Sequence, residues 1–145
     1  MKTCCVLGLG YIGLPLSGTL ANNGFKVIGV DINNQIIRKV NAGNIHIIEK
    51  DLQEVINKAV KSGNLFAQSK PVKADIFIIA VPTPFKKEFK DIPSPDITFV
   101  LDAAKSIANV INNNNLVLIE STCPVGTTER VKDCIEKYSP IKNIK

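Results

Sequence analysis

Three glycines near the start of this 145-residue chain, Gly8, Gly10 and Gly13, have the spacing G-x-G-x-x-G. They follow a short apolar run at residues 3–9 and precede a segment with helical spacing that begins near Tyr11. A strand that leads directly into a helix needs a tight turn, which the first glycine permits, and the third glycine lets the helix pack close to the strand. The pattern therefore predicts a strand–turn–helix unit at the start of an α/β domain.

Apolar runs and helical periodicities alternate along the rest of the chain. We expect strands over residues 3–9, 26–31, 65–69, 75–83 and 116–121, and helices over 11–22, 34–41, 51–62, 97–111 and 124–138. Right-handed crossovers between such elements build a mostly parallel sheet with helices on both faces. The predicted fold class is thus doubly wound α/β, the Rossmann fold, in a single domain over 1–145.

Several local features refine this prediction. The strands at 75–83 and 116–121 lack polar alternation, so both are expected to be buried. The proline-rich and charged segment 84–96 is expected to be an exposed loop, with Asp96 as the N-cap of the next helix. In the first helix, Ile12, Leu16 and Leu20 recur on one face, which we expect to pack inward.

Composition excludes several functions. The net charge of +5 comes from lysines scattered along the chain, which favours a solvated surface over a nucleic-acid footprint. No apolar stretch approaches the roughly 18 residues that span a bilayer, and no signal peptide is recognisable, so we expect a cytoplasmic protein that contacts no membrane. The four cysteines, at 4, 5, 123 and 134, match no metal-binding spacing and are expected to be buried thiols in a reducing compartment.

The glycine turn also predicts a ligand. Its second glycine would let the backbone approach a pyrophosphate, and the N–H groups of Tyr11 and Ile12 would contact the phosphates at the helix N-terminus. Asp31 lies 18 residues after Gly13, at the end of a predicted strand, where a carboxylate accepts hydrogen bonds from a ribose. Its charge would repel a 2′-phosphate, so the predicted cofactor is NAD, although Arg38 argues weakly for NADP. A purely structural turn is the alternative.

Two further segments follow predicted strands and should face the same ligand. Thr83 lies in the sequence VPTP, and its hydroxyl could reach the nicotinamide half of the cofactor. Ser121 and Thr122 precede Pro124, where their hydroxyls could cap the last helix or face the cofactor. Cys123 is expected to be an inert thiol, because the sequence shows no base beside it.

The remaining candidates have simpler structural interpretations. His46, the single histidine, lies in an apolar setting and is expected to be a hydrogen-bonded structural residue and not a general base. Asp51 and Glu54 lie one turn apart on a predicted helix and are expected to be solvated. We expect no metal site.

The segments GLGYIGLP, VDIN, VPTPF and ESTCPVGTTE, in this order and spacing, resemble the UDP-glucose/GDP-mannose dehydrogenase family. The forms GYIGLP, IHIIEKDL and VPTPFK are more similar to the branch acting on UDP-N-acetylmannosamine and related UDP-N-acetylhexosamines. The UDP-glucose branch tends to have glycine where Pro82 stands. One departure is Lys50, where the family often has proline.

The resemblance implies an enzyme that oxidises the C6 hydroxyl of a nucleotide sugar to a carboxylate in two NAD-dependent steps, in polysaccharide biosynthesis. It implies an NAD-binding domain, which this chain covers, followed by a central dimerising helix and a UDP-binding domain, in a homodimer. The family's catalytic lysine and cysteine would lie beyond residue 145, so no catalytic residue is expected here. The implied cofactor contacts are Tyr11 and Ile12 on the pyrophosphate, Asp31 on the ribose, and Thr83 and Thr122 near the nicotinamide. The UDP-glucose branch and a non-catalytic dinucleotide-binding module are the alternatives.

Overall fold

The computed structural model describes residues 1–86, 94–142 and 144. Its strands are β1 (Thr3–Leu7), β2 (Lys26–Val30), β3 (Leu65–Gln68), β4 (Ile76–Ile79) and β5 (Leu116–Ile119), and its helices are α1 (Gly13–Asn22), α2 (Asn34–Asn41), α3 (Leu52–Lys61), α4 (Thr98–Ile107) and α5 (Thr127–Tyr138). The five strands form one sheet in the order β3-β2-β1-β4-β5, and every neighbouring pair is parallel. The predicted doubly wound α/β class is confirmed.

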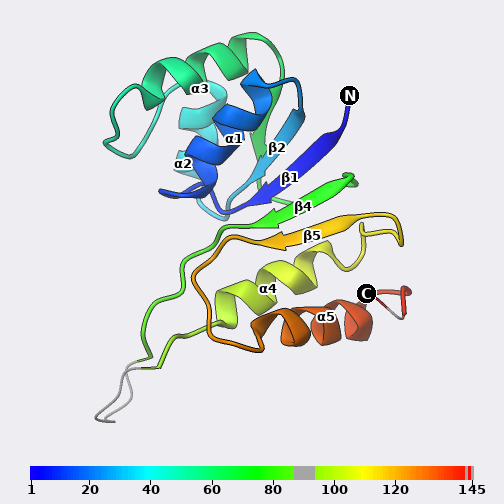
Figure 1. The fold of residues 1–145 in the computed structure, drawn as a ribbon. Coiled ribbons are helices and arrows are strands. Elements are labelled where there is room, and N and C mark those ends of the chain that lie inside the picture. The colour runs from blue at the N-terminus through cyan, green and yellow to red at the C-terminus, as the bar shows by residue number, and fades with distance from the viewer. Residues whose placement is uncertain (87–93, 143, 145) are drawn as a thin grey trace.

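Helices cover the two faces of the sheet unequally. Figure 1 shows α1, α2 and α3 on one side of the sheet and α4 and α5 on the other. Alternate side chains of β1 supply both layers: Cys4 and Val6 pack under the first helices, whereas Cys5 and Leu7 pack under α4 and α5. The central strand therefore has both faces buried, as its continuous apolar sequence predicts.

The strand β5 differs from the prediction of a second buried strand. It pairs only with β4, so it lies at the edge of the sheet. Leu116 and Leu118, which point to the face that carries α1–α3, are 51% and 39% exposed. By contrast β4, with Phe77 and Ile79 fully enclosed, is as buried as expected. An apolar run by itself does not distinguish a central strand from an edge strand.

The inward face of α1 also differs from the expected one. Ser17, Gly18 and Ala21 are buried, whereas Ile12 precedes the helix and is exposed. A Cβ at Gly18 would come within 2.8 Å of a methyl group of Ile56. Small residues therefore let α3 pack closely on α1, with Leu16 and Leu20 at the margin of the contact.

The outer edge of β3 is closed by a side chain. The Asn41 amide, at the end of α2, accepts the N–H of Ala67 at 2.7 Å and donates to the Ala67 carbonyl at 2.8 Å. This pair of bonds imitates a further strand and satisfies backbone groups that would otherwise be open to pairing.

The long connection after β4 begins and ends as a paired stem. Phe85 and Pro95 form an antiparallel bridge, and the N–H of Asp96 donates to the Pro84 carbonyl at 2.7 Å. The rest of the segment that was predicted to be an exposed loop, residues 87–93, lies outside the described residues. At the far end of the loop, the Asp96 carboxylate accepts the N–H of Thr98 at 2.9 Å, although Ile97 occupies the N-cap position.

The helix boundaries agree with the prediction most closely where capping is local. The helix α2 begins and ends as expected, and the Asn33 side chain accepts the Gln35 N–H at its start. The helix α5 starts at Thr127 and not at Pro124, because Gly126 adopts a left-handed conformation. The helix α4 ends at Ile107, short of the expected residue 111. No helix in the described ranges is long and apolar enough to span a membrane.

Candidate dinucleotide site at the carboxyl edge of the sheet

The first and third glycines of the turn after β1 are required by the protein itself. Gly8 has a φ of +94°, and a Cβ there would lie 2.5 Å from the Ala80 carbonyl oxygen. A Cβ at Gly13 would lie 1.8 Å from the Gly8 carbonyl oxygen. The turn is anchored to β2 because the Gly8 N–H donates to the Val30 carbonyl at 2.8 Å. These contacts confirm the close strand–helix packing expected from the motif.

The second glycine has a different environment. A Cβ at Gly10 would meet no atom within 4 Å, so nothing inside the protein demands glycine there. The N–H groups of Tyr11 and Ile12, just before α1, are hydrogen-bonded to none of the described residues. Open backbone and unpaired N–H groups at a helix N-terminus are what a bound phosphate requires. The turn therefore fits a dinucleotide pyrophosphate.

Asp31 lies directly after β2 and is half-buried beside the glycine turn. Its Oδ2 accepts the Leu9 N–H at 3.0 Å, and its Oδ1 accepts the Asn33 N–H at 2.8 Å. Each carboxylate oxygen keeps further acceptor capacity for a ribose hydroxyl. Asp31 thus also holds the glycine turn against the start of α2, a role that spacing alone does not reveal.

The other half of the edge is formed by the segments after β4 and β5. Thr83 is half-buried and Thr122 is exposed. Neither side chain forms a hydrogen bond within the described part of the chain, so both hydroxyls are free to meet a ligand. The strand order reverses direction between β1 and β4, and such a switch point is where open α/β sheets bind ligands.

The helix-capping interpretation of Ser121 is wrong, because its side chain bonds to the segment after β4 and not to α5. Its hydroxyl donates to the Val81 carbonyl at 2.8 Å and so joins the two segments. The first turn of α5 is closed by Thr127 instead, whose hydroxyl donates to the Pro124 carbonyl at 2.7 Å.

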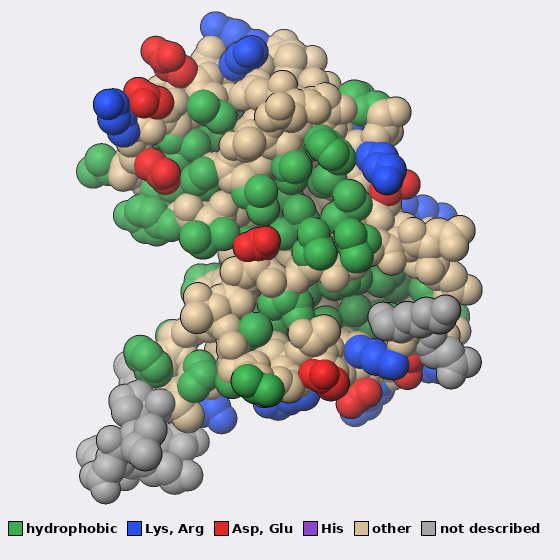
Figure 2. Space-filling model, viewed as in Figure 1, with side chains coloured by type: hydrophobic (Ala, Val, Ile, Leu, Met, Phe, Trp, Pro, Cys, Tyr) green, Lys and Arg blue, Asp and Glu red, His purple; other side chains and the backbone are tan. Residues whose placement is uncertain are grey.

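A hollow is visible at this edge of the molecule. Figure 2 shows a notch at the side where the strands end, with hydrophobic side chains on both of its margins. Exposed apolar side chains of the segments that follow strands or precede α1 and α3 include Tyr11, Ile12, Ile32, Ile48, Phe85 and Val125. Aliphatic and aromatic surface of this kind suits the flat faces of an adenine and a nicotinamide ring.

The thiols do not all behave as expected. Cys4 and Cys5 are buried in β1, and burial raises the pKa of Cys5 to about 11. Cys123 is exposed, contrary to the expectation of four buried thiols, and Cys134 is half-buried.

Within residues 1–86, 94–142 and 144, no cluster of His, Cys, Asp and Glu could hold a metal ion.

His46 is not the hydrogen-bonded residue that the sequence suggested. Its Nδ1 is buried and has no partner among the described residues, and burial lowers its pKa although Asp31 opposes the shift. Asp51 and Glu54 are exposed, as expected.

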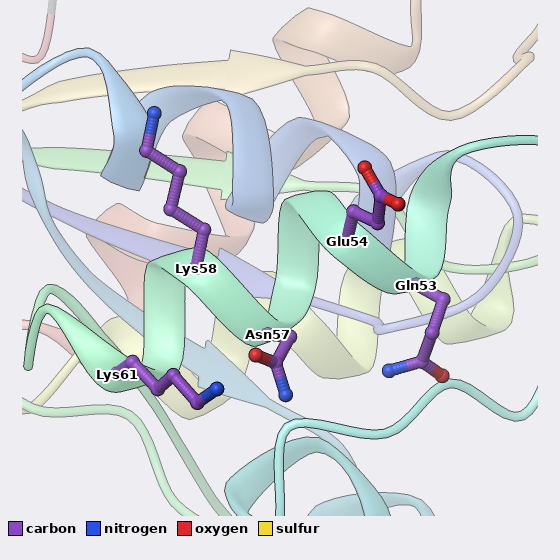
Figure 3. Close-up of a pocket in the computed structure, with 5 residues that line it drawn as sticks. All are labelled: Gln53, Glu54, Asn57, Lys58 and Lys61. Carbon is purple, nitrogen blue, oxygen red and sulfur yellow. The ribbon is translucent and has the colours of Figure 1, made fainter.

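A second hollow lies away from this edge, along the outer side of α3. Figure 3 shows its lining residues, Gln53, Glu54, Asn57, Lys58 and Lys61, spread along one helix with their side chains pointing in different directions. The Gln53 amide is already engaged, because it donates to the Gly43 carbonyl at 2.7 Å. This surface offers no converging set of polar groups.

The sheet order, the glycine turn and Asp31 together define a dinucleotide-binding domain of the Rossmann class. Residues 2–144 match the model of the UDP-glucose/GDP-mannose dehydrogenase family, NAD binding domain. The chain belongs to this family and is its NAD-binding domain.

Individual relatives agree with this assignment. UDP-N-acetyl-D-mannosamine dehydrogenase of Yersinia pestis is 48% identical over 139 residues, which are 96% of this chain and 32% of the relative. The Campylobacter jejuni protein of the same name is 50% identical over 127 residues, or 88% of this chain and 30% of the relative. The chain therefore spans about a third of the length of these relatives.

Solved structures show the same fold. UDP-N-acetyl-mannosamine dehydrogenase from Staphylococcus aureus superposes with a TM-score of 0.88 at 42% identity, over 94% of this chain and 33% of that one. A ternary complex of GDP-mannose dehydrogenase from Pseudomonas aeruginosa has a TM-score of 0.88 at 28% identity, over 98% of this chain and 33% of that one.

Proposed function

We propose that the chain holds NAD along the carboxyl edge of its sheet, with each predicted residue in a defined role. The N–H groups of Tyr11 and Ile12 contact the pyrophosphate, and Asp31 accepts hydrogen bonds from the adenosine ribose. Thr83 and Thr122 lie near the nicotinamide ribose and amide. The observation that carries this proposal is the set of unpaired N–H groups beside the open second glycine, next to a carboxylate that retains acceptor capacity.

We also propose that the longer protein oxidises the C6 hydroxyl of UDP-N-acetyl-D-mannosamine, or of a related UDP-N-acetylhexosamine, to the carboxylate. NAD held at the glycine turn and Asp31 would supply the hydride acceptor for both two-electron oxidations, the second of which also takes up a water molecule. The identities of 48% and 50% to two relatives with this name support the N-acetylhexosamine branch.

We further propose an organisation with more domains, which is supported by the chain covering about a third of its relatives' length. A central dimerising helix and a UDP-sugar-binding domain, with the catalytic lysine and cysteine, would follow residue 145 in a homodimeric enzyme of polysaccharide biosynthesis. The chain by itself is then expected to bind NAD without turning over a sugar. The four free thiols agree with the proposed cytoplasmic location, where thiols stay reduced.

Cofactor binding is tested by titrating the chain with NADH and NADPH and following nicotinamide fluorescence. We expect NADH to bind at least about tenfold more tightly, because the Asp31 carboxylate repels a 2′-phosphate. Absence of NADH binding, or equal affinity for both nucleotides, would contradict the proposal.

The role of Asp31 is tested by ratios of affinities, because Asp31→Asn also removes one of the two acceptors that hold the turn, and that loss affects both ligands of a ratio. Asp31→Asn should narrow the NADH preference over NADPH, and it should abolish the difference between NADH and its 2′-deoxyadenosine analogue. Asp75→Asn is the matched control, since the Asp75 carboxylate also accepts a backbone N–H, that of Thr3 at 2.7 Å, but lies just before β4, at the opposite end of that strand from the proposed site. The control should leave both ratios unchanged. Unchanged ratios in Asp31→Asn would remove the ribose role.

The sugar is decided by assaying the full-length protein with UDP-N-acetyl-D-mannosamine and UDP-glucose. Two NADH per molecule of the N-acetylhexosamine support the proposal. Preference for UDP-glucose would place the protein in the other branch. No turnover of either sugar, together with intact NADH binding, would favour a non-catalytic dinucleotide-binding module.

A further inference from the structure

The backbone hydrogen bonds between β4 and β5 follow a regular pattern, which indicates where the next bond would form. Ile76 pairs with Leu116 and Ile79 with Ile119. The N–H of Leu116 donates to the Asp75 carbonyl at 3.0 Å, and that of Glu120 donates to the Ile79 carbonyl at 2.9 Å. In a parallel ladder every second residue makes this contact. The next contact in the series would join the Thr122 N–H to the Val81 carbonyl.

A side chain makes that contact instead. The Ser121 hydroxyl donates to the Val81 carbonyl at 2.8 Å, and the Ser121 N–H turns back to the Ile79 carbonyl at 3.2 Å. The Thr122 N–H is bonded to no described residue, and the Thr122 side chain is exposed. The backbone therefore leaves the sheet before the Thr122 N–H can pair. The Val81 carbonyl accepts a hydrogen bond from the Ser121 hydroxyl instead.

We propose that Ser121 is a positioning residue that sets the nicotinamide end of the cofactor site. Its hydroxyl takes the place of the Thr122 N–H in the ladder, so Thr122 is released toward the edge while β5 stays tied to the segment that carries Thr83. The inference rests on the proposed cofactor roles of these two threonines. Ser121 itself touches no cofactor atom in this arrangement and acts through Thr122 and Val81.

The proposed arrangement depends on the hydroxyl group of residue 121. In Ser121→Ala the Val81 carbonyl loses its donor, and the Thr122 N–H is the nearest replacement, which draws Thr122 back into the ladder. Ser121→Thr keeps the hydroxyl and should keep the arrangement. The adenosine and pyrophosphate contacts lie on β1 and β2, so a change confined to β4 and β5 should spare them.

The experiment measures the dissociation constants of NADH and ADP by isothermal titration calorimetry. ADP has the adenosine and pyrophosphate but neither the nicotinamide nor its ribose. Ser121→Ala should weaken NADH about three- to tenfold and ADP less than about twofold, as expected for one hydrogen bond. Ser121→Thr should restore NADH binding. Ser106→Ala is the matched control, because the Ser106 hydroxyl also donates to a carbonyl but lies within α4.

A double-mutant cycle tests whether Ser121 acts through Thr122. Thr122→Val should weaken NADH by a similar factor, and the combination with Ser121→Ala should cost no more than the larger single change. Additive losses, an equal loss for ADP, or unchanged NADH binding would overturn the proposal. If Ser121→Ala fails to fold, Ser121→Cys, with its weaker donor, repeats the test. Wild-type chain that binds no NADH would instead refute the proposed function.

Discussion

The turns after β1 and β5 serve the same edge of the sheet but are built in opposite ways. The turn after β1 is packed so closely that protein atoms occupy the space beside Gly8 and Gly13. The turn after β5 displays Thr122, Cys123 and Val125 to solvent and is tied to its neighbour through the Ser121 side chain. The first turn is defined by steric exclusion and the second by a hydrogen bond.

The difference follows from the positions of the two strands. The strand β1 has β2 and β4 beside it and helices over both faces, so its turn forms inside a filled space. The strand β5 has a single neighbour, and Leu116 and Leu118 on one of its faces lack a covering helix among the described elements.

The largest effect is expected from Gly13→Ala. Its Cβ would overlap the Gly8 carbonyl oxygen, so either the turn or α1 must move. The free energy of unfolding, measured by urea denaturation, should fall by about 3 kcal/mol or more. A loss below about 1 kcal/mol would show that the turn after β1 is not held by steric exclusion.

Gly10→Ala should separate binding from folding. The new methyl group meets open space in the protein, but it would enter the path of the proposed pyrophosphate. NADH should bind at least about tenfold more weakly, while the free energy of unfolding changes by about 0.5 kcal/mol or less. Fluorescence titration and urea denaturation of the same variant give both values. Undiminished NADH binding would mean that the pyrophosphate does not lie over this glycine.

Gly126→Ala tests the turn after β5 in the same way. Its φ of +85° is left-handed, but a Cβ there would meet no atom within 4 Å. The cost is conformational strain of about 1 kcal/mol without a clash, well below that of Gly13→Ala. Gly126→Asn should lose less, because asparagine tolerates the left-handed region better. A loss as large as that of Gly13→Ala would show that the two turns are equally constrained.

The last prediction concerns Cys123, in the turn after β5, and Cys5, in β1, and at neutral pH it leaves stability unchanged. Cys123 is exposed and should react with a disulfide reagent in the folded protein, whereas Cys5 should react only after unfolding. Because burial raises the pKa of Cys5 to about 11, the unfolded state loses this proton first as the pH rises above about 9. Stability should therefore decline between these values, and Cys5→Ala should flatten the decline. A decline of the same slope in Cys5→Ala would assign it to other groups.

Local patterns predicted the elements whose causes are local. The helix α2 follows from the Asn33 cap and a helical repeat. Gly8, Gly13 and Asp31 were found by the fixed spacing of a sequence motif, although distant residues such as Ala80 explain why Gly8 must be glycine. The buried assignment of β5 was wrong because the run LVLI reads the same at the centre and at the edge of a sheet.

Contacts between distant segments could not be predicted from local sequence patterns. The bond from Leu9 to Asp31 joins residues 22 apart, and the bond from Ser121 to Val81 joins residues 40 apart. A serine before a proline suggests a helix cap by local rules, yet the Ser121 hydroxyl donates to the Val81 carbonyl in the segment after β4. The Asn41 amide similarly meets β3 only because α2 packs beside that strand.

The sequence alone determined the fold class, the glycine turn and the cofactor type, because each depends on backbone freedom, apolar periodicity or charge at single positions. Only the tertiary structure decided which strand lies at the edge, which face of α1 is buried and which hydroxyl continues the β4–β5 ladder. Those outcomes depend on which segments become neighbours after folding. Contacts between distant segments exist only in the folded chain, so the local sequence around each residue does not reveal them.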